Sequence, residues 1–383
     1  MTALNVDFEG GEVLRPGVGL ETGCLSIAEG RISNGSSGRK IDVSGYLVLP
    51  GMVDPHGDGF ERHVAPRRGA MPDIGEGIAS AEAELAANGI TTGVMAQFYS
   101  WEGGLRGPEF AAQVLPAITA ERGSLVTDLI PQLRFETHML DDYAELPALL
   151  AEWGVTYVVF NDHLQHDRLA EGRRPKALTG QALKAGRNPE VQFELLQKLH
   201  ANGPEVPAAL DHLAQVLAAQ GVRMGSHDDH TAEDRASWRA RGIRISEFPE
   251  TEEAARAARE GGDAVILGAP NVTRGGSHKG NASAAALVAM GLCDALASDY
   301  HYPSLRRAAL KLWRDGVCDF ATAWALVSEG PARLLGLEDR GTLALGKRAD
   351  IVLLDKATLR VAATLCAGRV SFLSGDLAAR FLA

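Results

Sequence analysis

The chain has 383 residues, of which 45% are hydrophobic and 23% charged, a composition typical of a globular protein with one large or two modest domains. Its formal net charge of -11 argues against a nucleic-acid partner, and no apolar run approaches the roughly 18 residues that a membrane helix needs. The four cysteines are scattered without a Cys-x-x-Cys pair, so we expect small buried thiols in a reducing, cytoplasmic compartment.

The two ends of the chain, residues 1–47 and 340–383, carry short strand-like pieces separated by turns. Each end alone is too small to bury a hydrophobic core. We therefore expect the two ends to pair into one small β-sandwich domain.

Between these ends, short apolar runs alternate with segments rich in Ala, Leu and Glu. The runs cover 46–54, 90–97, 128–138, 155–162, 222–229, 243–250, 264–271 and 293–301. Each is apolar for most of its length, which is typical of parallel strands buried on both faces. Such strand–helix units predict an α/β fold, a (β/α)8 TIM barrel over residues 48–339. A doubly wound sheet is the alternative, but no Gly-x-Gly-x-x-Gly turn follows the first strand.

Residues 163–203 interrupt this pattern with a long polar segment that is basic in part. The segment is longer than the usual connection between a strand and a helix. We interpret it as an insertion near the barrel mouth, with a disordered loop as the alternative.

Histidines and carboxylates collect at the C-terminal ends of the predicted strands, where barrels of this type carry their chemistry. The residues at these ends are His56, Asp58, Glu136, His138, Asn161, Asp162, His163, His227, Asp228, Asp229, His230, Glu247, Asp299 and His301. A single histidine at a strand end is usually a packing or capping residue, but recurrence on several strands favours a metal site. Imidazole together with carboxylate suits Zn, Mn, Fe, Co or Ni and not Ca, and one or two ions would fit.

A second group of residues predicts a site for an anion. The run GAPNVTRGGSHKGN after the seventh strand supplies Arg274, Gly275, Gly276, His278 and Lys279. Glycine lets backbone amides approach phosphate oxygens closely, and the cationic side chains supply charge. Arg62 and Arg67 follow the first strand and could reach a second anionic group. The alternatives are a flexible turn for the first run and a solvated surface for Arg67.

The chain resembles the amidohydrolase superfamily of metal-dependent hydrolases. The resemblance lies in LPGMVDPHGD at the first strand, the histidine at strand five, ASD at strand eight and GTLALGKRADIVLLD near the C-terminus. More narrowly, HGDGFERHVAPRRG, ISEFPET, GAPNVTRGGSHKGN and SDYHYPSL resemble the diphosphatases of phosphonate degradation. That resemblance implies hydrolysis of a ribose 5-triphosphate that bears methylphosphonate at C1, with release of diphosphate.

Three departures shift the expected ligands toward carboxylates. Most superfamily members have His-x-His on strand one, where this chain has Asp58 as the second residue. Strand four offers no lysine, so Glu136 is the substitute bridge, and Glu247 stands where a strand-six histidine is usual. The resemblance then implies zinc foremost, with metal ligands His56, Asp58, Glu136, His227 and Asp299.

The implied catalytic groups are Asp299 as general base and Glu247 as a ligand or second base. The phosphate groups of the substrate would meet Arg62, Arg67, Arg274, Gly275, Gly276, His278 and Lys279. His138, His163 and His230 are expected to orient the metal ligands without binding the metal themselves.

Three other functions stay open, namely a hydrolase of C–N bonds, a nucleoside triphosphate pyrophosphatase and a binding protein without catalysis. The expected partner is a phosphorylated small molecule. A homo-oligomer, or contact with other phosphonate-pathway enzymes, is left open.

Overall fold

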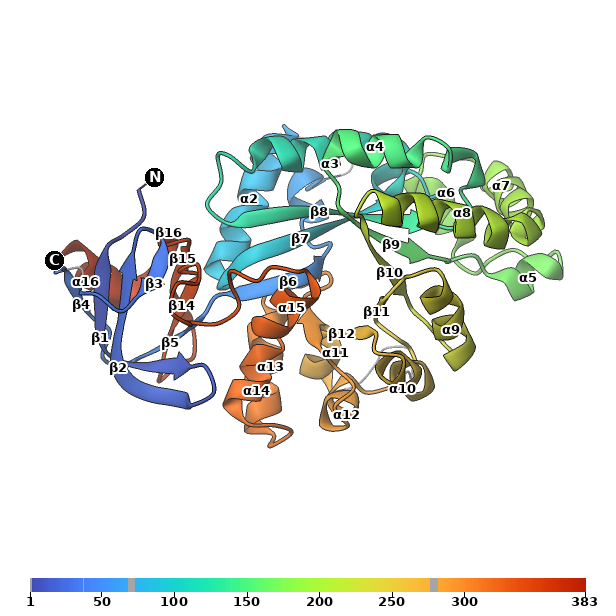
Figure 1. Cartoon of the computed structure of the whole chain (residues 1–383). Coiled ribbons are helices and arrows are strands. Elements are labelled where there is room, and N and C mark those ends of the chain that lie inside the picture. The colour runs from blue at the N-terminus through green and yellow to red at the C-terminus, as the bar shows by residue number, and fades with distance from the viewer. Residues whose placement is uncertain (1, 37, 68–72, 276–281) are drawn as a thin grey trace.

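Two eight-stranded sheets organise the part of the chain that the computed structural model describes, residues 2–36, 38–67, 73–275 and 282–383. One sheet is built from both ends of the chain, and the other is a parallel barrel (Figure 1). Both termini lie beside the first sheet, on the opposite side of the molecule from helices α5 to α7 (Figure 1). This arrangement leaves the far end of the barrel for the functional site.

The terminal sheet joins the two ends of the chain through one strand pair. Its order is β16-β15-β14-β5-β1-β2-β3, with β4 paired to β1. The strands are β1 (Val6–Arg15), β2 (Gly19–Ala28), β3 (Arg31–Ser33), β4 (Lys40–Asp42), β5 (Tyr46–Pro50), β14 (Ile351–Asp355), β15 (Val361–Cys366) and β16 (Arg369–Leu373), followed by helix α16 (Gly375–Leu382). Phe8, Leu25, Ile351 and Phe381 share its buried core. The expectation that both ends build one β domain is confirmed, and the pairings join all its strands into one sheet.

The barrel strands follow one another in chain order, and each is parallel to its neighbour. They are β6 (Met52–Gly57), β7 (Ile90–Tyr99), β8 (Asp128–Glu136), β9 (Tyr157–Asn161), β10 (Arg223–His227), β11 (Ile245–Glu247), β12 (Ala264–Gly268) and β13 (Ala295–Ala297). A parallel bridge between Gly57 and Asp299 brings the last strand back to the first. The predicted (β/α)8 barrel is therefore confirmed. The fold forms because the helices between the strands bury both faces of the apolar parallel sheet.

The helices around the barrel begin at capping residues that the sequence supplies. Asp73 accepts a hydrogen bond from the backbone N–H of Glu76 at the start of α2, and Thr251 caps α10 in the same way. The surrounding helices are α1 (Glu61–Val64), α2 (Ile74–Ala87), α3 (Pro108–Glu121), α4 (Leu146–Trp153), α8 (Val206–Ala219), α9 (Ala232–Ala240), α10 (Glu252–Glu260), α11 (Ala269–Arg274), α12 (Ala284–Ala289), α13 (Ser304–Arg314), α14 (Phe320–Ala325) and α15 (Glu329–Leu334). In the described parts of the chain, no helix combines the length and apolar character needed to cross a membrane.

The run 46–54 is two strands in different sheets, and its prediction as one strand is wrong. The chain changes sheets at Gly51, whose N–H donates to the carbonyl of Asp350 in the terminal segment. A Cβ at Gly51 would lie 2.4 Å from the side chain of Thr91, so a larger residue here would collide with Thr91. Pro50 and Gly51 mark a break in the run, but they do not reveal that the two halves pair with different sheets.

The segment 163–203 folds into helices at the C-terminal ends of β7 to β9. It contains α5 (His166–Ala170), α6 (Leu178–Lys184) and α7 (Pro189–Ala201), which lie beyond those strand ends (Figure 1). Leu169, Leu178 and Leu196 pack with Trp101, which follows β7, in one buried cluster. Arg187 donates to the carbonyl of Trp101 at 2.6 Å. The alternative of a disordered loop is wrong, because these leucines form a core of their own.

A buried arginine ties three barrel segments together. Arg235 on α9 is fully buried and lies 3.1 Å from a carboxylate oxygen of Asp229 and 2.8 Å from one of Asp263. It also donates to the Ser226 hydroxyl and to the carbonyl of Ile243. Removing one partner of such a buried network leaves uncompensated charge in a region of low dielectric.

We expect Arg235→Met to lower the free energy of unfolding by about 3–5 kcal/mol, since the buried Asp229 carboxylate would lose its cation, whereas Asp263 would keep Arg239 and Arg244. Urea unfolding of both proteins measures the difference. Lys311→Met is the matched control, because Lys311 forms an exposed pair with Asp315 on one helix and should cost at most about 0.5 kcal/mol. A loss below about 1 kcal/mol for the Arg235 variant would contradict the role of the network.

Candidate active site

Two predicted ligands, His56 and His227, meet Glu247, predicted as a ligand or second base, at the C-terminal ends of β6, β10 and β11. His56 Nδ1 lies 2.7 Å from Glu247 Oε2, and His227 Nδ1 lies 3.4 Å from the same oxygen. One ligand atom from each of the three residues falls within 4.8 Å of the others. The carboxyl ends of parallel strands meet at one edge of the barrel, so residues far apart in the chain converge there.

Glu247 is held as a carboxylate. Burial by itself would raise its pKa, but the neighbouring His56 and His227 outweigh burial and lower the pKa of Glu247 well below its usual value. Its other oxygen accepts hydrogen bonds from the Tyr157 hydroxyl at 2.5 Å and from Gln132 at 3.1 Å. An ionised, oriented carboxylate of this kind suits metal ligation better than proton transfer near neutral pH.

The histidines of this group are suited to bind a cation. Burial, reinforced by the charge of Arg134, lowers the pKa of His227 to about 4, so its imidazole is neutral at pH 7. The Nε2 atom of fully buried His56 has no hydrogen-bond partner among the described residues. An unsatisfied buried nitrogen costs about 1–3 kcal/mol, and a metal ion would satisfy it. The donor set therefore fits a divalent transition metal.

Asp58 and Asp299 face the same cavity from the two strands that close the barrel. Backbone bonds of 3.0 Å from Asp299 N–H to the carbonyl of His56, and from Asp58 N–H to that of Asp299, fix their positions. Burial, and then the charge of Asp58, raise the pKa of Asp299 to about 6. At pH 7 such a carboxylate is mostly ionised yet basic enough to accept a proton.

The backbone just beyond three of these strands is strained. Asp228, Phe248 and Asp299 have φ values of 59°, 55° and 55°, in the left-handed region that residues other than glycine rarely adopt. Each follows the end of a barrel strand and lines the cavity. Strain of this kind persists where the surrounding structure holds it, and it aims side chains or backbone groups at a site.

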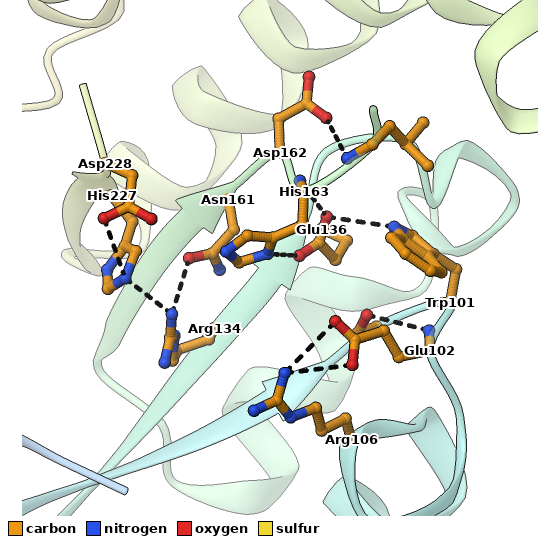
Figure 2. Close-up of polar contacts among 12 residues, drawn as sticks. Trp101, Glu102, Arg106, Arg134, Glu136, Asn161, Asp162, His163, His227 and Asp228 are labelled. Carbon is orange, nitrogen blue, oxygen red and sulfur yellow. Dashed lines mark hydrogen bonds and ion pairs between the residues drawn. The ribbon is translucent and has the colours of Figure 1, made fainter. Parts of the chain in front are cut away.

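Arg134 lies at the centre of the site, although the sequence did not single it out. Its Nη2 is 2.8 Å from His227 Nε2 (Figure 2). Its Nη1 is 3.5 Å from Asp58 Oδ2. The guanidinium also lies over the ring of Phe98, 3.9 Å from the ring centroid. One signal was available, because Arg134 precedes Glu136 by two residues on β8 and so shares its inward face.

Glu136 is not part of the group formed by His56, His227 and Glu247. It accepts hydrogen bonds from the indole of Trp101 at 3.3 Å and from the backbone and Nδ1 of His163 (Figure 2). The ring of His163 in turn lies 6.3 Å from that of His227. Glu136 is therefore held by Trp101 and His163, and the orienting role expected of His163 stays a prediction. The exposed His230 pairs with Glu250 instead.

A cavity of about 710 Å³ opens beside these residues. Among the described residues, four arginines line it, namely Arg62, Arg106, Arg134 and Arg274, together with Asp58, Glu61, His163, His227, Asp228, Glu250 and Asp299. These arginines share the cavity with the acidic groups, and Arg134 lies 3.5 Å from Asp58. The cavity can therefore hold an anionic molecule next to candidate metal ligands.

The predicted anion-binding residues differ in where they lie. Arg274 ends α11, is exposed and lies over the Tyr300 ring, while Gly275 follows it with φ of 83°. Arg62 pairs with Glu84 and donates to the carbonyl of Tyr300. Arg67 is exposed and is not among the described lining residues. The remaining predicted residues, Gly276, His278 and Lys279, lie outside the described residues.

Fold and site together define a (β/α)8-barrel protein with candidate metal ligands gathered at the C-terminal ends of its strands. Residues 62–372 match the sequence profile of the Amidohydrolase family, and the chain belongs to that family.

Individual proteins give the same placement. The α-D-ribose 1-methylphosphonate 5-triphosphate diphosphatase of Escherichia coli strain K12 is 32% identical over 346 residues, which are 87% of this chain and 90% of that protein. The N-acyl-D-glutamate deacylase of Bordetella bronchiseptica superposes with a TM-score of 0.61 at 15% identity, covering 97% of both chains. The N-acetylglucosamine-6-phosphate deacetylase of Pasteurella multocida gives 0.63 at 9% identity, covering 96% of this chain and 99% of that one. At these identities the two structures speak for the fold alone.

Proposed function

We propose that this protein is a metal-dependent diphosphatase that hydrolyses α-D-ribose 1-methylphosphonate 5-triphosphate in phosphonate catabolism, releasing diphosphate. The observation that carries the proposal is the set of four arginines in the cavity beside the candidate metal ligands. Their charge suits a substrate with a triphosphate at one end and a phosphonate at the other. The activity of the relative that is 32% identical supports the same reaction.

His56, His227 and Glu247 are the residues proposed to hold the metal, and Asp58, Glu136 and Asp299 stay predicted ligands nearby. When bound, a divalent ion supplies Lewis-acid polarisation of a phosphoryl oxygen and lowers the pKa of water. Zinc is the ion proposed, on the mixed imidazole and carboxylate donors.

The protein's own groups have separate proposed roles. Asp299, with its pKa raised to about 6, accepts the proton of the attacking water. Arg134 and Arg274 meet the negative charge that spreads over the phosphate oxygens as the phosphoanhydride breaks. Glu247, whose pKa is held low, is a weak base and serves as a ligand in this proposal.

The test is product release from a panel of substrates by zinc-loaded protein. The panel contains the methylphosphonate ribose 5-triphosphate, ATP and an N-acyl amino acid, and diphosphate, phosphate and free amine are each measured. We expect diphosphate from the first substrate, with a kcat/KM well above that for ATP. Equal rates on ATP would replace the proposal by a general pyrophosphatase, and amine release without diphosphate would replace it by a C–N hydrolase.

Arg274→Ala tests the anion-binding wall. We expect kcat/KM for the triphosphate to fall about tenfold, mainly through KM, since one exposed charge-assisted hydrogen bond to phosphate would be lost. Arg314→Ala is the matched control, because Arg314 is exposed at the end of α13 and does not line the cavity. Steady-state kinetics of both variants measure the effect, and equal KM values would remove Arg274 from the binding site.

Cytoplasmic location, self-association and contact with other phosphonate-pathway enzymes stay predictions of the sequence. They are separate from the proposed reaction and are not needed for it.

A further inference from the structure

A second cluster of possible metal ligands lies outside the candidate active site. It combines His138, which follows β8, with Asp162, which follows β9, and His166 at the start of α5. One ligand atom from each residue lies within 4.8 Å of the others. His138 is nearly buried, whereas Asp162 and His166 have side chains 38% exposed. The cluster is therefore open to solvent on one side.

The distances in this cluster are close to those of a tetrahedral zinc site. Zinc–nitrogen and zinc–oxygen bonds of 2.0–2.2 Å place neighbouring ligand atoms roughly 3.3 Å apart. His166 Nε2 lies 3.2 Å from Asp162 Oδ1, and His138 Nδ1 lies 3.6 Å from the same oxygen. Two of the three edges already have the required length, and the rings of His138 and His166 lie 4.9 Å apart. The ligand atoms of the third edge lie within 4.8 Å of each other.

His200 on α7 supplies the support that a ligating histidine usually has. Its Nδ1 lies 2.8 Å from His166 Nδ1, so one of the two nitrogens donates a hydrogen bond to the other. If His166 is the donor, its Nε2 carries a lone pair and faces the Asp162 carboxylate. Two lone pairs at 3.0 Å repel unless a cation lies between them. A histidine that binds metal commonly donates its other N–H in this manner.

The cluster is separate from the candidate active site. Figure 2 shows the Asp162 carboxylate pointing away from the Glu136–His163 pair. His138 lines a different cavity of about 380 Å³, and the described lining residues of the two cavities do not overlap. The two groups of candidate ligands share no residue, so each could bind a metal independently of the other.

We propose that His138, Asp162 and His166 bind a second divalent transition metal, of zinc type, with water completing its coordination. The ion would then link the loops after β8 and β9 to helix α5, and through His200 to helix α7. His163 lies between two of the ligands in the chain, and it contacts Glu136. The ion would thus fasten the segment 163–203 to the barrel and fix a residue that lines the substrate cavity.

The test counts metal ions in the full-length protein. Wild type, His166→Gln, Glu247→Gln and the double variant are loaded with zinc and dialysed against metal-free buffer, and bound zinc per chain is measured. The thermal midpoint with and without zinc, and the visible absorption of cobalt-loaded protein, are recorded beside it. We expect His166→Gln to lose one zinc per chain and part of the zinc-dependent rise in the thermal midpoint. Glu247→Gln should keep the zinc that His166→Gln loses, and the double variant should lose both effects.

His212→Gln is the matched control, because His212 is exposed on α8, and it should bind as much zinc as wild type. Asp162→Asn replaces His166→Gln if that variant does not fold. Unchanged zinc content and cobalt absorption in the folded variant would overturn the proposal. The cluster would then be a metal-free hydrogen-bonded chain in which His200 donates to His166 and His166 donates to Asp162. The readouts are independent of catalysis, so failure of the proposed diphosphatase reaction would leave this result intact.

Discussion

Asp299→Asn is expected to lower kcat for the triphosphate by about 10²–10⁴-fold, while the zinc proposed to be held by His56, His227 and Glu247 is retained. The amide keeps the size of the carboxylate but cannot accept the proton of water. Asparagine also tolerates positive φ, so the strained backbone at this position, with φ of 55°, is retained. Diphosphate release under saturating substrate, beside metal analysis, measures the effect.

The comparison of kcat with metal content decides what Asp299 does. A large loss of kcat with zinc retained supports its role as general base. Loss of zinc together with activity would show that Asp299 acts mainly as a metal ligand and would contradict its role as general base. A loss below tenfold would mean that another group accepts the proton.

Glu247→Gln is expected to weaken zinc binding at the active site by at least about 100-fold and to abolish diphosphate release at limiting zinc. The variant keeps the side-chain volume and an acceptor for the Tyr157 hydroxyl, but it removes the charge that faces His56 and His227. Competition with a chromophoric chelator gives the affinity. Excess zinc should restore part of the activity.

Glu250→Gln is the matched control for this change. Glu250 is a carboxylate in the same cavity that pairs with His230, so its replacement should leave zinc affinity within a few-fold of wild type. Equal zinc affinity for Glu247→Gln and wild type would show that His56 and His227 do not share a metal with this carboxylate. Glu136 and His163 would then be the next candidates for the metal ligands.

The barrel and the strand ends that carry the candidate site could be predicted because both depend on local sequence patterns. A buried parallel strand requires an apolar run of about five residues, and its C-terminal end is marked where polar residues begin. His56, His227 and Glu247 each stand at such an end, and the structure brings them together. The ends of parallel strands meet at one edge, so no long-range information was needed to gather them.

Other features depended on contacts between distant segments. The split of the first predicted strand at Gly51 follows from pairing with β14, some 300 residues away, which the local pattern cannot encode. Arg134 looked like one polar residue within a strand, and only closure of the barrel turned it toward His227 and Asp58. Glu136 stood at the expected strand end, yet His163 lies between it and the other ligands.

The sequence by itself determined the order of strands and helices and the end of the barrel that carries imidazole and carboxylate groups. Periodicity, turns and caps involve only a few consecutive residues, so they can be recognised in the sequence without knowing the tertiary contacts. The tertiary structure alone decided which of these groups touch. It seated α5 and α7 against the loops after β8 and β9 and so brought His138, Asp162 and His166 within reach of one ion. Side-chain contact depends on the relative position of whole elements, and packing sets that position only after the fold is complete.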